Sequence, residues 1–177
     1  GLICGDPRLL GAALAPIRVP NSQCGIADPV TVSAINGIAL RGDVRISCDA
    51  AQSFADWIEG SLQPISRAHR KTVTRIDIAA TYACRTRNSR PGARISNHAF
   101  GNGIDISAFH FADGRISRVL GDWGKEGRNG FLQTVQRSAC LAFNTVLGPE
   151  ADAAHQNHFH FDIAPTYRSG SYCPISR

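Results

Sequence analysis

The segment from His155 to Asp162 most constrains how this chain can fold. Its second half, continued to residue 163, alternates between apolar and polar side chains, with Phe159, Phe161 and Ile163 set against His158, His160 and Asp162. Such alternation predicts a β-strand with one face in the core. Two imidazoles and a carboxylate on the other face are costly unless they bind something. The segment therefore predicts a strand that carries a polar site.

A second stretch, residues 96–105, reads Ser-Asn-His-Ala-Phe-Gly-Asn-Gly-Ile-Asp. Isoleucines on both sides of Asp105 predict a strand that turns this carboxylate away from the core. Gly101 and Gly103 allow the backbone to turn tightly, so that His98 and Asp105 can reach one ion. Two histidines and one aspartate would leave a fourth position for water, as in catalytic zinc sites. The alternative is that these histidines are surface or hydrogen-bonded structural residues.

The remaining chain predicts an α+β fold, in which a small, largely antiparallel sheet carries helices and a zinc cleft and is stapled by disulfides. Its 177 residues fit a single domain, residues 1–177. Residues 1–29 are rich in proline and glycine and are expected to be extended or irregular. Periodicity and turn signals predict a hairpin over Val30–Leu40, a helix over Asp49–Leu62 ended by Pro64, a strand over Val73–Tyr82, a hairpin at Asp113-Gly114 and a helix over Phe131–Leu147.

Six cysteines stand far apart, at positions 4, 24, 48, 84, 140 and 173. Their even number and the absence of Cys-x-x-Cys favour disulfides over zinc thiolates, although the 15 possible pairings stay open. Disulfides indicate an oxidising compartment, which is the periplasm, the cell surface or the exterior. No apolar run is long enough for a transmembrane helix. The lack of methionine and of a signal peptide suggests a processed form.

The net charge of +5 is carried mostly by arginine. Arg85, Arg87, Arg90 and Arg94 could form a basic patch for nucleic acid. Without interleaved aromatic residues, helix-turn-helix or zinc-finger spacing, we expect no nucleic-acid partner. An anionic cell-wall polymer would explain the same charge, and a solvated loop is the plainest alternative.

The pattern Ser-x-His-x-x-Gly-x-Gly-x-Asp followed by His-x-His resembles that of the zinc peptidases that include lysostaphin, the D-alanyl-D-alanine carboxypeptidases and dipeptidases, and the penicillin-insensitive murein endopeptidase. The one departure is Gly103, where alanine is usual. More closely, the chain from Cys24 to Cys173 resembles the bacterial extensin-like C-terminal domain family. The residues that carry this resemblance are Tyr82-Ala83-Cys84-Arg85, Ser96–Phe109, Ala139–Pro149 and His155–Asp162.

The resemblance implies one zinc ion per chain, with the ligands His98, Asp105 and His160. It implies substrate binding or oxyanion stabilisation for Arg85, whose structural alternative is an ion pair with a carboxylate. Where the carboxypeptidase branch has a glutamate base, this chain has Asn157. The base must then be a histidine, either of the two at positions 155 and 158, whose spacing is similar to that of the murein endopeptidase.

The function implied is a zinc peptidase that hydrolyses peptide crosslinks or stem peptides of peptidoglycan in the periplasm, with zinc-activated water and histidine as general acid and base. The alternatives are a zinc-bearing cell-wall binding module without catalysis and a metal-free cell-wall binder. Neither the bond cleaved nor the oligomeric state follows from the sequence.

Overall fold

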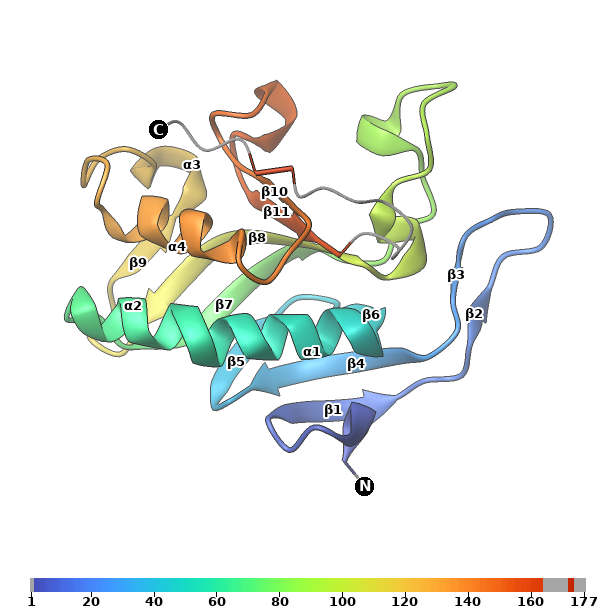
Figure 1. Ribbon diagram of the computed structural model, residues 1–177, viewed down its shortest axis with the longest axis horizontal. Helices are drawn as coiled ribbons and strands as arrows, with labels where there is room; N and C mark the ends of the chain where they lie inside the picture. The colour runs from blue at the N-terminus through green and yellow to red at the C-terminus, as the bar shows by residue number, and fades with distance from the viewer. Residues whose placement is uncertain (1, 164–171, 174–177) are drawn as a thin grey trace.

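A nine-stranded sheet forms the frame of the protein (Figure 1). This computed structural model describes residues 2–163 and 172–173. The strands are β1 (Leu9–Ala13), β2 (Ile17–Arg18), β3 (Gly25–Ile26), β4 (Pro29–Ile35), β5 (Ile38–Arg41), β6 (Arg45–Ser47), β7 (Val73–Ala80), β8 (Gly103–Phe111), β9 (Ile116–Arg118), β10 (Thr145–Leu147) and β11 (Phe159–Asp162). The helices are α1 (Cys48–Trp57), α2 (Gln63–Ala68), α3 (Val119–Asp122) and α4 (Phe131–Ala139).

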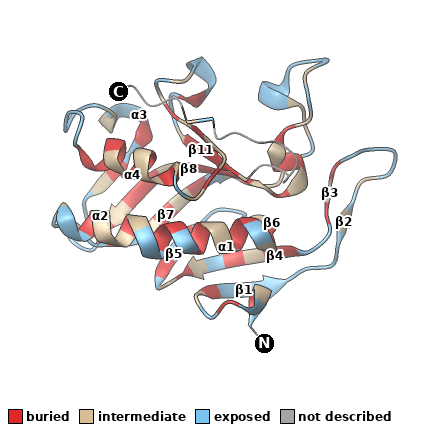
Figure 2. Cartoon of the chain, in the orientation of Figure 1, coloured by how far each residue is buried: buried red, intermediate tan, exposed pale blue. Residues whose placement is uncertain are grey.

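The sheet is larger than predicted and is mixed in direction. Its order is β1-β4-β5-β7-β8-β11-β10, with β6 paired to β4 and β9 paired to β8. β5 and β7 run parallel, whereas the other neighbouring strands run antiparallel. A parallel pair needs a long crossover, which the helical segment between β5 and β7 supplies. The prediction of a small antiparallel sheet is therefore corrected, while the combination of strands with helices packed along one side is confirmed (Figures 1 and 2).

The first helical segment is longer than predicted. Ser47 caps α1 by accepting a hydrogen bond from the Ala50 amide at 3.2 Å. Trp57 near the end of α1 is 1% exposed and lies in the core. The predicted end at Pro64 is wrong, because α1 continues through a π-helical turn, Ile58–Leu62, into α2. Pro64 lies in the first turn of α2, and the wider π turn before it accommodates the missing N–H.

The second predicted helix is too long. α4 has the expected buried stripe, but it ends at Ala139, and the chain forms β10 from Thr145. Val146, expected on the helix, instead pairs with Phe161 of β11. The β-branched side chains of Thr145 and Val146 favour a strand, and pairing with β11 overrides the helical spacing.

Both predicted hairpins are present. Asn36 and Gly37 join β4 to β5 with φ values of 47° and 82°, the left-handed pair of a tight hairpin turn. The hairpin at Asp113-Gly114 joins β8 to β9.

A β-bulge at Ser107 interrupts β8. Ile106 lies opposite Ile78 and Ala108 lies opposite Asp77, so Ser107 is left without a partner on β7. The bulge shifts the alternation of side chains, and both Ile106 and Phe109 are therefore buried in the core.

Residues 1–29 are more regular than predicted. β1 is an edge strand paired with β4, and β2 and β3 form a separate two-stranded ribbon. The sequence of β1, Leu-Leu-Gly-Ala-Ala, does not alternate between apolar and polar residues, so its pattern did not predict a strand.

Three disulfides join Cys4 to Cys48, Cys24 to Cys84 and Cys140 to Cys173. The prediction that all six cysteines are paired is confirmed. These bonds indicate an oxidising, extracytoplasmic compartment. Among the described residues, no helix has the length and apolar character needed to span a membrane.

Candidate metal centre

Asp105 and His160 face each other on adjacent strands. β8 and β11 pair antiparallel, with His160 directly opposite Asp105. Phe159 and Phe161, on either side of His160, are fully buried in the core. Alternation along the strand then turns His160 to the other face of the sheet. Because burial of each phenylalanine contributes about 1.5–3 kcal/mol, the core face of β11 fixes the direction of its polar face.

His98 reaches the same point from a short helical turn, Asn97–Phe100. The hydroxyl of Ser96 accepts a hydrogen bond from the His98 amide at 3.3 Å. Gly101 ends the turn with a φ of 70°, which glycine adopts without steric cost. Gly103 contributes space rather than a turn, because a Cβ atom there would lie 3.0 Å from Nδ1 of His98. The glycine that replaces the usual alanine thus makes room for the His98 ring.

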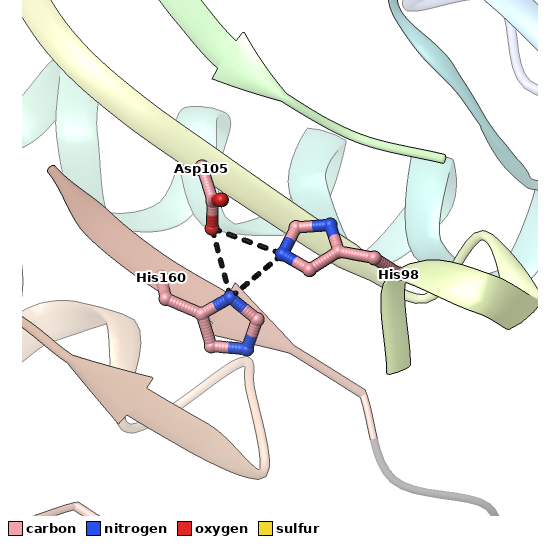
Figure 3. Close-up of side chains that lie close together, drawn as sticks. All are labelled: His98, Asp105 and His160. Carbon is pink, nitrogen blue, oxygen red and sulfur yellow. Dashed lines mark hydrogen bonds and ion pairs between the residues drawn. The ribbon is translucent and has the colours of Figure 1, made fainter. Parts of the chain in front are cut away.

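Three donor atoms converge in this region (Figure 3). Nε2 of His98 lies 3.1 Å from Oδ1 of Asp105 and 3.1 Å from Nδ1 of His160, and the latter two atoms are 2.8 Å apart. All three residues are buried. Ligands of a tetrahedral zinc ion, at roughly 2.0–2.1 Å from the metal, stand about 3.3 Å from one another. This group could hold a metal ion after a small expansion, and its two imidazoles and one carboxylate suit zinc.

The outer nitrogen of each imidazole is also held. Nδ1 of His98 donates a hydrogen bond to the carbonyl of Thr81, because a carbonyl can only accept. This contact orients the ring so that Nε2 of His98 is directed at the centre. Nε2 of His160 lies 2.8 Å from Oδ2 of Asp162. Such outer partners fix the orientation of metal-binding histidines, and Asp162 is in position to do this for His160. The carbonyl of Thr81 carried no signal in the sequence.

The charges of the centre are strongly coupled. Burial opposes ionisation of Asp105, but hydrogen bonds from His160 and His98 outweigh it and hold the pKa of this carboxyl well below its usual range. Burial also opposes protonation of His160, yet hydrogen bonds to Asp105 and Asp162 outweigh it and raise the pKa of His160 to about 9. A protonated His160 donates to both carboxylates, and a metal ion would take the place of the proton on Nδ1.

This exchange predicts a pH-dependent metal affinity. The pKa of His160 lies above the usual value of about 6.5, so metal-free protein keeps this proton until the pH rises through about 9. Zinc binding between pH 6 and 8 is therefore expected to release at least about one proton, and the apparent affinity should rise with pH. Calorimetric titration of chelator-treated protein in buffers of different ionisation enthalpy measures both quantities. An affinity that stays constant over this range would contradict the expectation.

His155 and His158 lie beside the centre. Their rings have centroids 5.1 Å apart, and that of His155 lies 5.9 Å from that of His160. Nε2 of His158 lies 3.6 Å from Oδ2 of Asp105. Burial lowers the pKa of His158 against the raising effect of Asp105, which favours the neutral ring. The structure thus brings both predicted histidines to the three candidate ligands.

Each of these histidines has a polar partner on its other nitrogen. Nδ1 of His155 lies 2.7 Å from Oδ1 of Asp152, and Nδ1 of His158 lies 2.7 Å from Oδ1 of Asn157. Neither partnership was predicted from the sequence. For Asp152 a signal existed, because an aspartate three residues before a histidine can meet it within one helical turn.

A pocket of about 480 Å³ opens over the centre. The two stretches predicted to form the site line it together, and so do Asp152, Leu147 and the two arginines at positions 85 and 87. The guanidinium of Arg85 donates to the carbonyl of Thr86 at 3.4 Å. Within residues 2–163 and 172–173, Arg85 forms no ion pair, so its predicted structural alternative is not what the structure shows.

The fold and the buried triad define a disulfide-linked α/β protein with a candidate metal centre. A family model described as "Extensin-like protein C-terminus" matches residues 10–174, and the chain belongs to this family. The resemblance to the extensin-like C-terminal domain family is thereby confirmed. No curated protein and no solved structure matches the chain.

Proposed function

We propose that this protein is a zinc-dependent peptidase that hydrolyses peptide crosslinks or stem peptides of bacterial peptidoglycan. The observation that carries the proposal is the buried triad of His98, Asp105 and His160, with each outer ring nitrogen held by an acceptor and two further histidines beside it. A purely structural cluster would not need three converging donor atoms at the floor of an open pocket. The choice of peptidoglycan rests on the resemblance to the murein peptidases.

His98, Asp105 and His160 would hold the ion. When bound, zinc acts as a Lewis acid and lowers the pKa of a water molecule toward about 7. Three protein ligands leave one position for this water and for the substrate carbonyl, which is the ligand number of catalytic rather than structural zinc sites.

His158 is best placed to act as the general base. Its Nδ1 is taken by the side-chain oxygen of Asn157, so this nitrogen carries the proton and Nε2 is left with its lone pair. Nε2 is the nitrogen that faces Asp105, on the side of the ligands. A base must lie within hydrogen-bond reach of the proton it accepts, and the position of Nε2 on the side of the ligands supports this role.

His155 and Asp152 form a second proton-carrying pair. Asp152 accepts from Nδ1 of His155 and also from the Ala154 amide at 2.8 Å, which fixes the carboxylate in place. With Nδ1 held in this way, Nε2 of His155 would take up the proton that His158 removes from the water and pass it on to the leaving amine. Arg85 and the ion together would stabilise the oxyanion that forms as the peptide carbonyl is attacked.

The periplasm is the proposed location. Three disulfides require an oxidising compartment, and peptidoglycan lies within the periplasm of a double-membraned bacterium.

A zinc-bearing cell-wall module without catalysis is the second candidate. The triad alone would serve it equally well, because a binding module needs only a stable metal. The two histidines beside the triad favour the peptidase, since a module of this kind has no use for them.

The deciding experiment combines metal analysis with digestion of purified muropeptides. We expect about one zinc ion per chain, cleavage that a chelator abolishes, and recovery when zinc is returned; the products would name the bond. Zinc without cleavage of any muropeptide would favour the binding module. Absence of stoichiometric metal, even after zinc is offered, would overturn the proposal.

A further inference from the structure

The two arginines that line the pocket lie on a short two-stranded ribbon beside the metal centre. Thr86 pairs with Ile95 in an antiparallel bridge, flanked by hydrogen bonds from the Ser96 amide to the Arg85 carbonyl at 3.0 Å and from the Arg87 amide to the Arg94 carbonyl at 2.9 Å. The backbone at Thr86 is extended, so the side chains of Arg85 and Arg87 point to the same face of the ribbon. That face is a wall of the pocket.

Both ends of the ribbon are fixed. Cys84, just before it, is bonded to Cys24, and Ser96, just after it, caps the turn that carries His98. The arginine face therefore has a set position relative to the candidate metal ligand. A flexible, solvated loop would not be tied in this way.

The carboxylates that line the pocket have close partners of the opposite kind, whereas the guanidinium groups of its two arginines do not. Each of its three carboxylates, Asp105, Asp152 and Asp162, lies within 2.8 Å of a histidine nitrogen. In contrast, neither guanidinium contacts a carboxylate anywhere in the described part of the chain, and Arg85 has a single long bond to the Thr86 carbonyl. Among the described residues, most of the donors of Arg85 and Arg87 thus have no acceptor that would compete with a ligand in the pocket. Guanidinium groups bind carboxylates in paired, charge-assisted geometry.

We propose that Arg85 and Arg87 form an anion subsite that binds a carboxylate of the substrate in the same pocket as the metal centre. This inference rests on the proposed function and names its substrate class: peptides with a free carboxylate near the scissile bond, in preference to the same peptides amidated there. Arg87 determines this selectivity, whereas Arg85 has the additional role near the oxyanion described above.

The test compares two muropeptides that differ only in whether one carboxyl group is free or amidated. We expect the zinc-loaded wild type to cleave the free acid with a kcat/KM at least about tenfold higher, mainly through a lower KM. Arg87→Glu and Arg87→Gln should remove the preference while leaving zinc content unchanged. Arg90→Glu is the matched control, because Arg90 is exposed on the same segment but does not line the pocket, and it should keep the preference.

Equal cleavage of the two muropeptides by the wild type would overturn the inference, as would equal effects of Arg87→Glu and Arg90→Glu. If neither muropeptide is cleaved, the proposed function fails, and calorimetric binding of the same two peptides then decides the subsite separately. Tighter binding of the free acid, lost in Arg87→Glu, would support the subsite. Equal binding, or binding of neither peptide, would overturn it.

Discussion

Replacement of His160 by alanine is expected to abolish both zinc binding and hydrolysis. This residue provides one of three donor atoms, and its Nδ1 lies 2.8 Å from Asp105 and 3.1 Å from Nε2 of His98. Loss of an outer partner typically lowers metal affinity or activity by about 10–100-fold. Loss of a ligand itself should exceed that, so we expect a fall of at least about 10³-fold in kcat/KM, with substoichiometric zinc after dialysis.

His110→Ala is the matched control for this change. His110 is also a histidine on the sheet, but its ring bonds to Asp77, 2.7 Å away, and it does not line the pocket. It should keep full zinc content and activity. Metal analysis and muropeptide digestion, together with a circular dichroism spectrum, measure the outcome. A His160→Ala protein that is folded and retains stoichiometric zinc would show that the triad is not the metal centre.

Replacement of His158 by alanine is expected to separate catalysis from metal binding. General base catalysis contributes roughly 10²–10⁴-fold, and kcat should fall by that amount. Because His158 is not one of the three converging donors, about one zinc ion per chain should remain. The KM should change little, since the side chain acts on the water rather than on the substrate. Steady-state kinetics and metal analysis of the same preparation measure all three quantities.

His155→Ala is the informative comparison. If His155 serves as the proton donor, this variant should also lose activity with zinc retained, and its loss should be largest for substrates with poor leaving amines. A His158→Ala protein of undiminished kcat would contradict the role of His158 as the base. If neither variant lost activity, a histidine acid-base mechanism would be excluded.

Strongly patterned segments were predictable from the sequence. The alternation in β11 and the Asn36-Gly37 turn each specify local structure with little competition, and both predictions were confirmed. Predictions failed where distant pairing outweighed local pattern. Val146 has the spacing of the apolar residues of α4, but it lies in β10 and pairs with Phe161. No feature of the neighbouring sequence predicts that partner. Pro64 normally ends a helix, but the π turn before it depends on how the whole segment packs.

The candidate centre was predictable for a similar reason. Side chains of His98, Asp105 and His160 are visible in the sequence, and strand alternation gives the direction of two of them. The hydrogen-bond partners of these imidazoles were only partly predictable. The acceptor for His98 is the backbone carbonyl of Thr81, which any residue at that position could provide. The shared orientation of Arg85 and Arg87 depends on the bridge between Thr86 and Ile95, and no periodic pattern in the sequence predicts that pairing.

The pairing of β8 with β11 decides when the centre can form. Asp105 and His160 become neighbours only after β11 has been synthesised and has paired with β8. A growing polypeptide that has emerged only as far as Asp105 therefore holds two of the three donors and cannot complete the set. If the centre holds a metal ion, that ion can meet all three ligands only after β11 has paired with β8, so assembly of the sheet comes before completion of the site.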